Sequence, residues 1–129
     1  MTDTQTPTTD QITAVVDAYL ASLDEPDATK RAELVAQAWA PDGRYTDPLQ
    51  ELNGHAELAS MQAVVQEHYA GASFRRTSGI DAHHDSVRFA WDLTYPDGTL
   101  VIAGIDVGRL GPDGKLTSIT GFFGDLPAA

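Results

Sequence analysis

The sequence contains no cysteine, few basic residues and no long apolar run. Without cysteine the chain has no disulfide, no thiolate nucleophile and no cysteine-based zinc site. Its 8 Lys and Arg residues face 19 Asp and Glu, for a net charge of −11 with His neutral. Such a surface repels nucleic-acid phosphates and anionic lipids. No apolar run approaches the ~20 residues of a membrane span, and the polar N-terminus does not resemble a signal peptide. We therefore expect a soluble, cytoplasmic protein without nucleic-acid or membrane partners.

A chain of 129 residues is expected to form one domain around one apolar core. Residues 1–8 are polar and rich in threonine, and we predict that they form a disordered N-terminal tail. Residues 9–129 contain neither an internal repeat nor a linker, so they are predicted to form the single domain.

Apolar residues at helical spacing predict three helices in the first part of the chain. Thr8 and Gln11 have the spacing of a capping box at the start of the first helix. Trp39 lies on the buried stripe of the second helix. The expected helices are residues 9–23, a second that starts after Asp27 and ends at a turn over residues 40–43, and a third between Asn53-Gly54 and Gly71.

From residue 73 onward, apolar residues alternate with polar ones, as they do in strands with one buried face. The expected strands are residues 44–47, 74–81, 87–95, 100–110 and 116–123, with turns at residues 82–85, 96–98 and 111–114. Helices followed by a meander of strands indicate an α+β fold, in which three N-terminal helices pack on a curved, mainly antiparallel sheet. Such a sheet leaves a pocket between itself and its helices.

Asp106 is the most unusual residue of the expected sheet. It is a single carboxyl on an otherwise apolar strand face, with Gly104 and Gly108 two residues away on either side. The glycines leave room for another group beside the carboxyl. Because burial disfavours the charged form, we expect the pKa of Asp106 to be raised, so that the neutral acid can donate a hydrogen bond at pH 7. The alternative is a structural Asp that bonds a neighbouring side chain or a bulged backbone.

Two further candidates are weaker when each is taken alone. Asp47 ends a short strand just before Pro48 and shares one strand face with Tyr45, but Asp-Pro also favours simple turns. Tyr19 lies on the apolar stripe of the first helix, where most tyrosines are core residues with one hydroxyl partner.

The histidines form no spacing typical of metal ligands, so we expect no metal site. No glycine-rich phosphate loop and no serine nucleophile elbow occur, and the sequence predicts no cofactor. His55 begins the third helix, where it either lines the mouth of the pocket or is a surface residue.

The chain resembles the nuclear transport factor two-like superfamily of SnoaL-like polyketide cyclases and ketosteroid isomerases, which share a cone-shaped fold. The resemblance covers the chain from about Ile12 to Asp125. Within the superfamily, the sequence is most similar to bacterial ketosteroid isomerase. The resemblance is carried by Thr13-Ala14-Val15-Val16 through Tyr19, Thr46-Asp47-Pro48, Ile105-Asp106 and Phe123-Gly124.

The resemblance implies a role for each candidate. Tyr19 and a protonated Asp106 would donate hydrogen bonds to the carbonyl oxygen of a small apolar substrate as it becomes an enolate. Asp47 would be the general base that moves a proton next to that carbonyl. Ketosteroid isomerases are known for a carboxylic acid that stays neutral at pH 7 and donates a hydrogen bond. This division of roles therefore comes from the resemblance.

The resemblance also implies an apolar wall that keeps these hydrogen bonds dry. The residues expected to bind substrate there are Trp39, His55, Met61, Phe89, Trp91, Ile102 and Phe123. Two positions differ from the family pattern. Gln62 replaces a supporting tyrosine on the third helix, and Trp91 replaces a smaller apolar residue, which is expected to shrink the cavity below the size of a steroid.

Three functions fit the sequence. The first is an isomerase or related proton-transfer enzyme. The second is a SnoaL-like cyclase, or epoxide-hydrolase-like chemistry, that uses the same acids. The third is a small-ligand-binding module without catalysis, because a fold does not settle a function.

The outward face of the strand over residues 100–110 is also apolar, although a sheet buried on one side does not require this. Val101, Ala103, Ile105 and Val107 lie on that face, and Phe122 of the last strand adds to it. We expect a homodimer through this face unless a chain terminus covers it.

Overall fold

The computed structural model describes residues 7–129 and contains three helices and seven strands in that range. The helices are α1 (Thr9–Asp24), α2 (Ala28–Ala38) and α3 (Gly54–His68). The predicted capping box is confirmed, because Thr8 accepts from the backbone N–H of Gln11 while the Gln11 side chain accepts from that of Thr8. Asp27 caps α2 as predicted. Within the tail predicted for residues 1–8, residues 1–6 lie outside the described part.

The strands form one curved sheet in which most neighbours are antiparallel. They are β1 (Trp39–Asp47), β2 (Gln50–Asn53), β3 (Ser73–Arg76), β4 (Asp81–His83), β5 (Ser86–Thr94), β6 (Leu100–Leu110) and β7 (Leu116–Phe123). The order across the sheet is β2-β1-β7-β6-β5-β3, with β4 also paired to β5. Among the described residues, β1 and β7, the first and last strands of the sheet in chain order, are the only pair that runs parallel.

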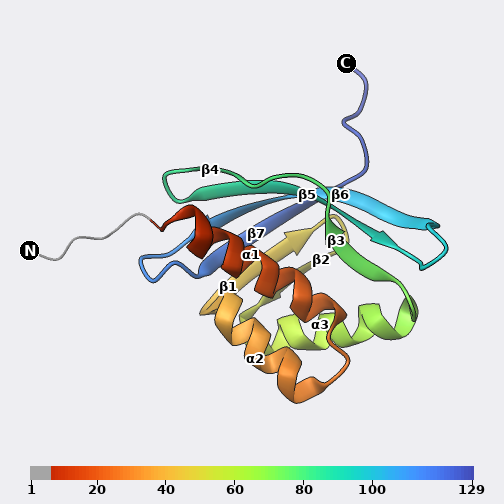
Figure 1. The fold of residues 1–129 in the computed structure, drawn as a ribbon, viewed down its shortest axis with the longest axis horizontal. Coiled ribbons are helices and arrows are strands. Elements are labelled where there is room, and N and C mark those ends of the chain that lie inside the picture. The colour runs from red at the N-terminus through yellow and green to blue at the C-terminus, as the bar shows by residue number, and fades with distance from the viewer. Residues whose placement is uncertain (1–6) are drawn as a thin grey trace, which may run out of the picture.

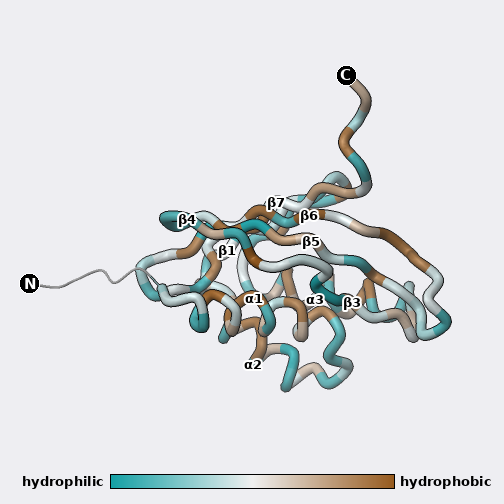
Figure 2. The backbone as a smooth tube through the Cα atoms, turned by 45° about the horizontal axis from the view of Figure 1, so that its top comes forward, coloured by the Kyte–Doolittle hydropathy of each residue, from teal (hydrophilic) through white to brown (hydrophobic). Residues whose placement is uncertain are grey.

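The three helices all lie against one face of the sheet (Figure 1), which confirms the predicted α+β class. The tube in Figure 2 shows apolar stretches recurring along the helices and the long strands, with polar residues at the turns. Inward-facing residues of β5, β6 and β7 meet α1 and α2 in a single core. Its most deeply buried side chains include Val16, Val35, Trp39, Leu58, Leu116 and Ile119. Within residues 7–129, no helix is long and apolar enough to span a membrane.

The passage from α2 into the sheet differs from the predicted turn over residues 40–43. Strand β1 begins at Trp39, directly after the last residue of α2, and its pairing with β7 shifts register between Trp39 and Arg44. The indole of Trp39 folds back over the strand, and a Cβ on Gly43 would collide with it. Gly43 thus serves close packing within β1 rather than a turn.

The strand predicted over residues 74–81 is divided into β3 and β4. Between them Thr77 donates its backbone N–H to the carbonyl of Ala90, and the hydroxyl of Ser78 accepts from the N–H of Ala90. This side-chain bond replaces a ladder bond and interrupts the pairing. Strand β2 was not predicted. It is short and polar, and it forms a hairpin with β1 in which Asp47 pairs with Gln50.

Candidate active site

Tyr19, Asp47 and Asp106 line one cavity of about 110 Å³ between the helices and the sheet. They come from three separate elements: the buried face of α1, the last residue of β1 and the middle of β6. The rest of the wall is mostly apolar and comprises Leu20, Leu23, Tyr45, Leu49, Gln50, Met61, Val65, Tyr69, Phe74, Trp91, Leu93, Ile102 and Phe123. Polar groups far apart in the chain therefore share a small apolar space.

Asp106 points inward because the alternation along β6 places every second side chain beneath the helices. The hydroxyl of Tyr19 donates to Asp106 Oδ2 at 3.0 Å, and both side chains are buried. Across the β6–β7 pairing, Asp106 faces Gly121. A Cβ on Gly121 would lie 3.0 Å from Asp106 Oδ1 and 3.5 Å from the Tyr45 hydroxyl oxygen. The glycine therefore keeps open the space in which these polar groups meet.

The pKa of Asp106 is raised to about 7, mainly by burial, and the nearby charge of Asp47 contributes to the rise. The hydrogen bond from Tyr19 and the nearby indole N–H of Trp91 act in the opposite direction and only partly offset the loss of solvation. Burial, followed by the charge of Asp106, also raises the pKa of Tyr19 well above its ordinary value. Near neutral pH the site thus holds a protonated tyrosine beside a carboxyl that is protonated in a large fraction of molecules.

Asp47 accepts hydrogen bonds from three donors. The Tyr45 hydroxyl lies 2.7 Å from Asp47 Oδ2, the backbone N–H of Leu49 donates to Oδ1 at 2.8 Å, and the Gln50 amide donates to Oδ2 at 3.3 Å. The Leu49 contact is the turn bond expected of Asp before Pro. One carboxyl oxygen therefore holds the turn, while the other faces the polar groups of the cavity.

The room beside Asp106 is filled by the protein itself. Had Gly104 a Cβ, it would lie 2.6 Å from Cζ2 of Trp91 and would collide with the carbonyl of Phe122. A Cβ on Gly108 would lie 3.2 Å from atoms of Leu116 and Val87. The glycines therefore admit neighbouring side chains, which corrects the expectation that they leave space for another group. Within residues 7–129, Trp91 Nε1 and Asp106 Oδ1 are buried and have no partner at hydrogen-bonding distance.

Four of the seven residues expected to bind substrate line the cavity, and three do not. Those on the wall are Met61, Trp91, Ile102 and Phe123. Trp39 and Phe89 instead pack edge-on against the ring of Tyr19, with centroid distances of 5.8 Å and 6.4 Å. The Nε2 of His55 lies 3.0 Å from the carbonyl oxygens of Trp39 and Ala40, so His55 joins α3 to β1 away from the cavity. These three residues therefore act on the site indirectly, by holding Tyr19 and β1 in place.

Two residues belong to the site although the sequence pattern did not assign them to it. Tyr45 bonds Asp47, and burial raises the pKa of its hydroxyl, so it stays a donor. The signal for Tyr45 is its position two residues before Asp47 on the same strand face. Gly121 has no comparable local signal, because its importance appears only when β6 and β7 are paired.

Gln62, one of the two positions that depart from the family pattern, is fully buried. Its amide donates to the hydroxyl of Ser22 at 2.9 Å, and that hydroxyl donates to the carbonyl of Tyr19 at 2.6 Å. Gln62 therefore supports the turn of α1 that carries Tyr19 and does not touch the Tyr19 hydroxyl. In the described part of the chain, no three His, Asp or Glu side chains gather in a way that could hold a metal ion.

Known structures share this fold. An inferred isomerase of the SnoaL-like family from Agrobacterium tumefaciens str. C58 is 34% identical, with a TM-score of 0.83 over 90% of this chain and 99% of that one. An inferred SnoaL-like polyketide cyclase from Jannaschia sp. CCS1 is 16% identical, with a TM-score of 0.71 over 95% of this chain and 91% of that one. An NTF2-like protein of unknown function from Exiguobacterium sp. 255-15 is 18% identical, with a TM-score of 0.70 over 87% of this chain and 99% of that one.

The last two similarities show the fold alone, because their sequence identity is low. No curated protein sequence is significantly similar to this chain. The sequence model of the SnoaL-like domain matches residues 16–119, a span that includes Tyr19, Asp47 and Asp106. Together with the similarity to the Agrobacterium protein over nearly its whole length, this match shows that the chain belongs to the SnoaL-like domain family.

Proposed function

We propose that the protein is an isomerase that moves a proton next to the carbonyl of a small apolar compound. The observation that carries the proposal is the convergence of two carboxyls and a buried tyrosine on one apolar cavity, with the pKa of Asp106 raised to about 7 by burial. Pairs of carboxyls in different environments are typical of sites that need a base and an acid at the same pH. The SnoaL-like neighbour described as an inferred isomerase supports the same reaction class.

Asp47 is the proposed base. Its carboxyl accepts hydrogen bonds from Tyr45, Leu49 and Gln50, an environment that suits an ionised carboxylate. It would take a proton from the carbon beside the carbonyl, and the electrons of that C–H bond would form an enolate. Return of the same proton to a different carbon of the conjugated system would complete the isomerisation and restore the carboxylate.

Tyr19 and Asp106 are the proposed partners of the enolate oxygen. When Asp106 is protonated, its acid group can donate to the Tyr19 oxygen, and the Tyr19 O–H is then free to donate to the substrate. In the alternative arrangement the proton lies on Asp106 Oδ1, which has no partner within residues 7–129. Asp106 then donates to the substrate itself, while the Tyr19 hydroxyl keeps its bond to Oδ2. Donors aimed at developing charge in an apolar site commonly contribute ~10²–10³ in rate each.

The volume of the cavity limits the reacting part of the substrate. At about 110 Å³ the cavity is well below the ~300–1,000 Å³ of pockets that enclose drug-sized ligands. Trp91 lies against Gly104 and occupies part of the space near Asp106. We infer that a small ring or a short enone, rather than a steroid nucleus, occupies this cavity.

The replacement Asp47→Asn tests the base. It keeps the size of the side chain but removes the proton acceptor, so turnover should fall by ~10²–10⁴. The conversion of cyclohex-3-enone to cyclohex-2-enone, followed by ultraviolet absorbance, provides the assay. Proton NMR in D₂O detects exchange next to the carbonyl even where isomerisation is slow.

Asp42→Asn is the matched control, because Asp42 is an exposed residue of the same strand and does not line the cavity. This variant should retain full activity. If wild type neither isomerises nor exchanges protons of small ketones and enones above the buffer rate, the proposed function is wrong. The protein would then be better described as a ligand-binding module. Cyclised products from a polyketide ester would instead indicate a cyclase.

A further inference from the structure

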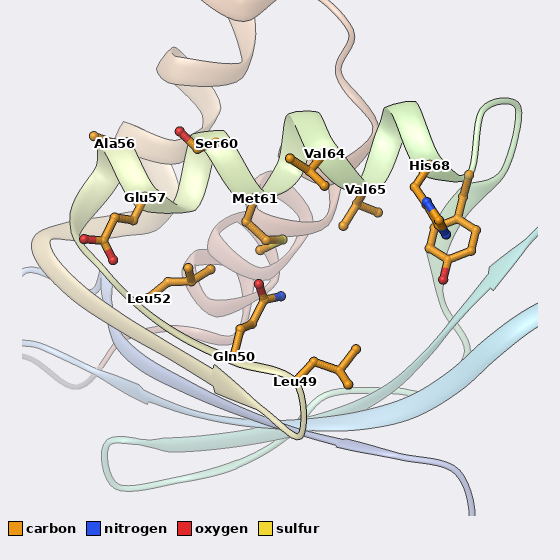
Figure 3. Close-up of a pocket in the computed structure, with 11 residues that line it drawn as sticks. Leu49, Gln50, Leu52, Ala56, Glu57, Ser60, Met61, Val64, Val65 and His68 are labelled. Atoms are coloured by element: carbon orange, nitrogen blue, oxygen red, sulfur yellow. The ribbon is translucent and has the colours of Figure 1, made fainter.

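A larger groove lies on the outside of the proposed active site. It has a volume of about 510 Å³ and runs between α3 and the β1–β2 hairpin. In Figure 3, side chains from the helix and the hairpin reach into this space from opposite sides. Its lining is Leu49, Gln50, Leu52, Ala56, Glu57, Ser60, Met61, Val64, Val65, His68 and Tyr69. Two of these apolar side chains are unusually exposed, Leu49 at 82% and Val64 at 64%.

The groove and the inner cavity share a wall. Five residues line both: Leu49, Gln50, Met61, Val65 and Tyr69. Met61 of α3 and Gln50 of β2 point toward one another across this boundary (Figure 3). The Gln50 amide also donates to the Asp47 carboxyl at 3.3 Å. The boundary between the two spaces is therefore made of side chains, one of which already touches the proposed base.

We propose that the groove binds an uncharged hydrocarbon tail of the substrate, while the reacting carbonyl end occupies the inner cavity. The substrate class would then be a short enone or ring ketone that carries an alkyl or aryl extension. This inference rests on the proposed function, because it assigns the cavity to the carbonyl. It accounts for an apolar groove that continues directly from a cavity too small for most ligands.

The charges near the groove favour a neutral tail. Its lining contains the acidic Glu57 and no Lys or Arg, and the chain as a whole carries a net charge of −11. Glu57 is held in place by the backbone N–H of Asn53 at 3.0 Å. A carboxylate or phosphate on the tail would meet repulsion and no basic partner other than His68. The apolar side chains of Leu49, Val64 and Val65 would instead lose solvent contact against a hydrocarbon.

A matched pair of probes separates the two spaces. Phenol has an oxygen on an unsaturated carbon, as an enolate does, and it tests the inner cavity alone. The compound 4-butylphenol adds a four-carbon tail. Full burial of one methylene is worth about fourfold in affinity, and the groove is open on one side, so the butyl group should improve the dissociation constant about tenfold in calorimetry.

Groove variants then locate the tail. Ser60→Phe fills the groove with bulk, and Val64→Asp places a charge in it; both residues are exposed and on the groove side of α3. Each should remove most of the gain from the butyl group and leave phenol binding unchanged. Glu67→Phe is the control, because Glu67 is exposed on the same helix but does not line the groove. Circular dichroism checks that all variants fold.

A third probe, 4-(4-hydroxyphenyl)butanoate, carries a carboxylate on the same tail and should bind no better than phenol. If phenol binds and the butyl group adds less than twofold, the groove inference is wrong while the proposed function stands. A gain that survives both Ser60→Phe and Val64→Asp, or an equal gain from the carboxylate tail, also overturns it. If phenol binds no better to wild type than to Tyr19→Phe, the proposed function fails, and the inference fails with it.

Discussion

Asp106 shows how one position on a strand can determine the chemistry of a side chain. The alternation along β6 turns it inward, the pairing with β7 sets it opposite Gly121, and burial raises its pKa to about 7. The direction of this shift was predictable from an acid on an apolar face. The hydrogen-bond partner Tyr19 and the neighbouring Trp91 were not predictable, because both reach Asp106 only through the tertiary fold.

The raised pKa predicts a pH-dependent cost to stability. The folded protein retains the Asp106 proton up to about pH 7, whereas the unfolded chain loses it near the ordinary value of 3.8. The contribution of this group to stability is therefore complete below the lower value and is lost as pH rises through the upper one. Asn at this position does not titrate. Relative to wild type, Asp106→Asn should gain about 3 kcal/mol in free energy of unfolding between about pH 5 and about pH 8, as an upper limit.

Urea unfolding at both pH values provides the measurement. Burial also raises the pKa of Asp24, but Asp24 titrates in both proteins and cancels from the comparison. A difference between variant and wild type that does not change with pH would mean that Asp106 is ionised throughout this range. The proposed donor role of its neutral form would then be untenable.

At the scale of the elements, the packing of β5, β6 and β7 requires a close approach that only a glycine allows. Gly104 pairs with Trp91 on one side and with Phe123 on the other. A Cβ there would collide with the carbonyl of Phe122 and lie 2.6 Å from the Trp91 ring. Backbone on one side and a buried indole on the other leave little room for relaxation.

Gly104→Ala should therefore destabilise the protein toward the upper end of the ~1–3 kcal/mol that overpacking usually costs. It should also shift the fluorescence of the displaced Trp91. Gly79→Ala is the control, because a methyl group added there would have no atom within 4 Å and the backbone at Gly79 has no positive φ. The control should change stability by less than ~1 kcal/mol. Equal unfolding midpoints for the two variants would contradict the tight packing at Gly104.

The elements that the sequence predicted well are those with a strong period and clear end signals. The strands β6 and β7 match residues 100–110 and 116–123, and α1 starts at its capping box. The misplaced boundary between α2 and β1 has a physical cause, since residues 40–43 contain a proline and a glycine and look like a turn. In the fold these residues lie in a bulged strand that packs around the Trp39 ring. The local sequence pattern gives no sign of this contact with Trp39.

At the scale of the whole molecule, the site exists only because the fold brings distant residues together. Tyr19 and Asp106 are 87 residues apart in the chain, and Asp47 lies on a third element. No spacing rule connects them, so the sequence linked them only through a family resemblance. The parts played by Tyr45 and Gly121 became visible only in the folded chain, because they depend on how β1, β6 and β7 meet.

The outer face of the sheet leads to the last prediction, which concerns assembly. Ile105 and Phe122 pair across β6 and β7, and they are 47% and 57% exposed. Val107 is exposed at 40% beside them, while Leu126 near the C-terminus is 94% exposed and does not cover the patch. We propose that a second copy of the chain packs against this face, since exposed apolar residues gathered on a sheet commonly mark an interface.

Ile105→Lys should convert the proposed dimer to a monomer, because the charged side chain would have to be buried between two copies without a partner. Gln37→Lys adds the same charge at an exposed position of α2, on the opposite side of the sheet, and should leave the dimer intact. Light scattering at micromolar concentration distinguishes the two masses. Wild type that scatters as a monomer would exclude the dimer. Because the cavity opens between the helices and the sheet and not onto this face, Ile105→Lys should still bind phenol, so assembly and active site can be tested apart.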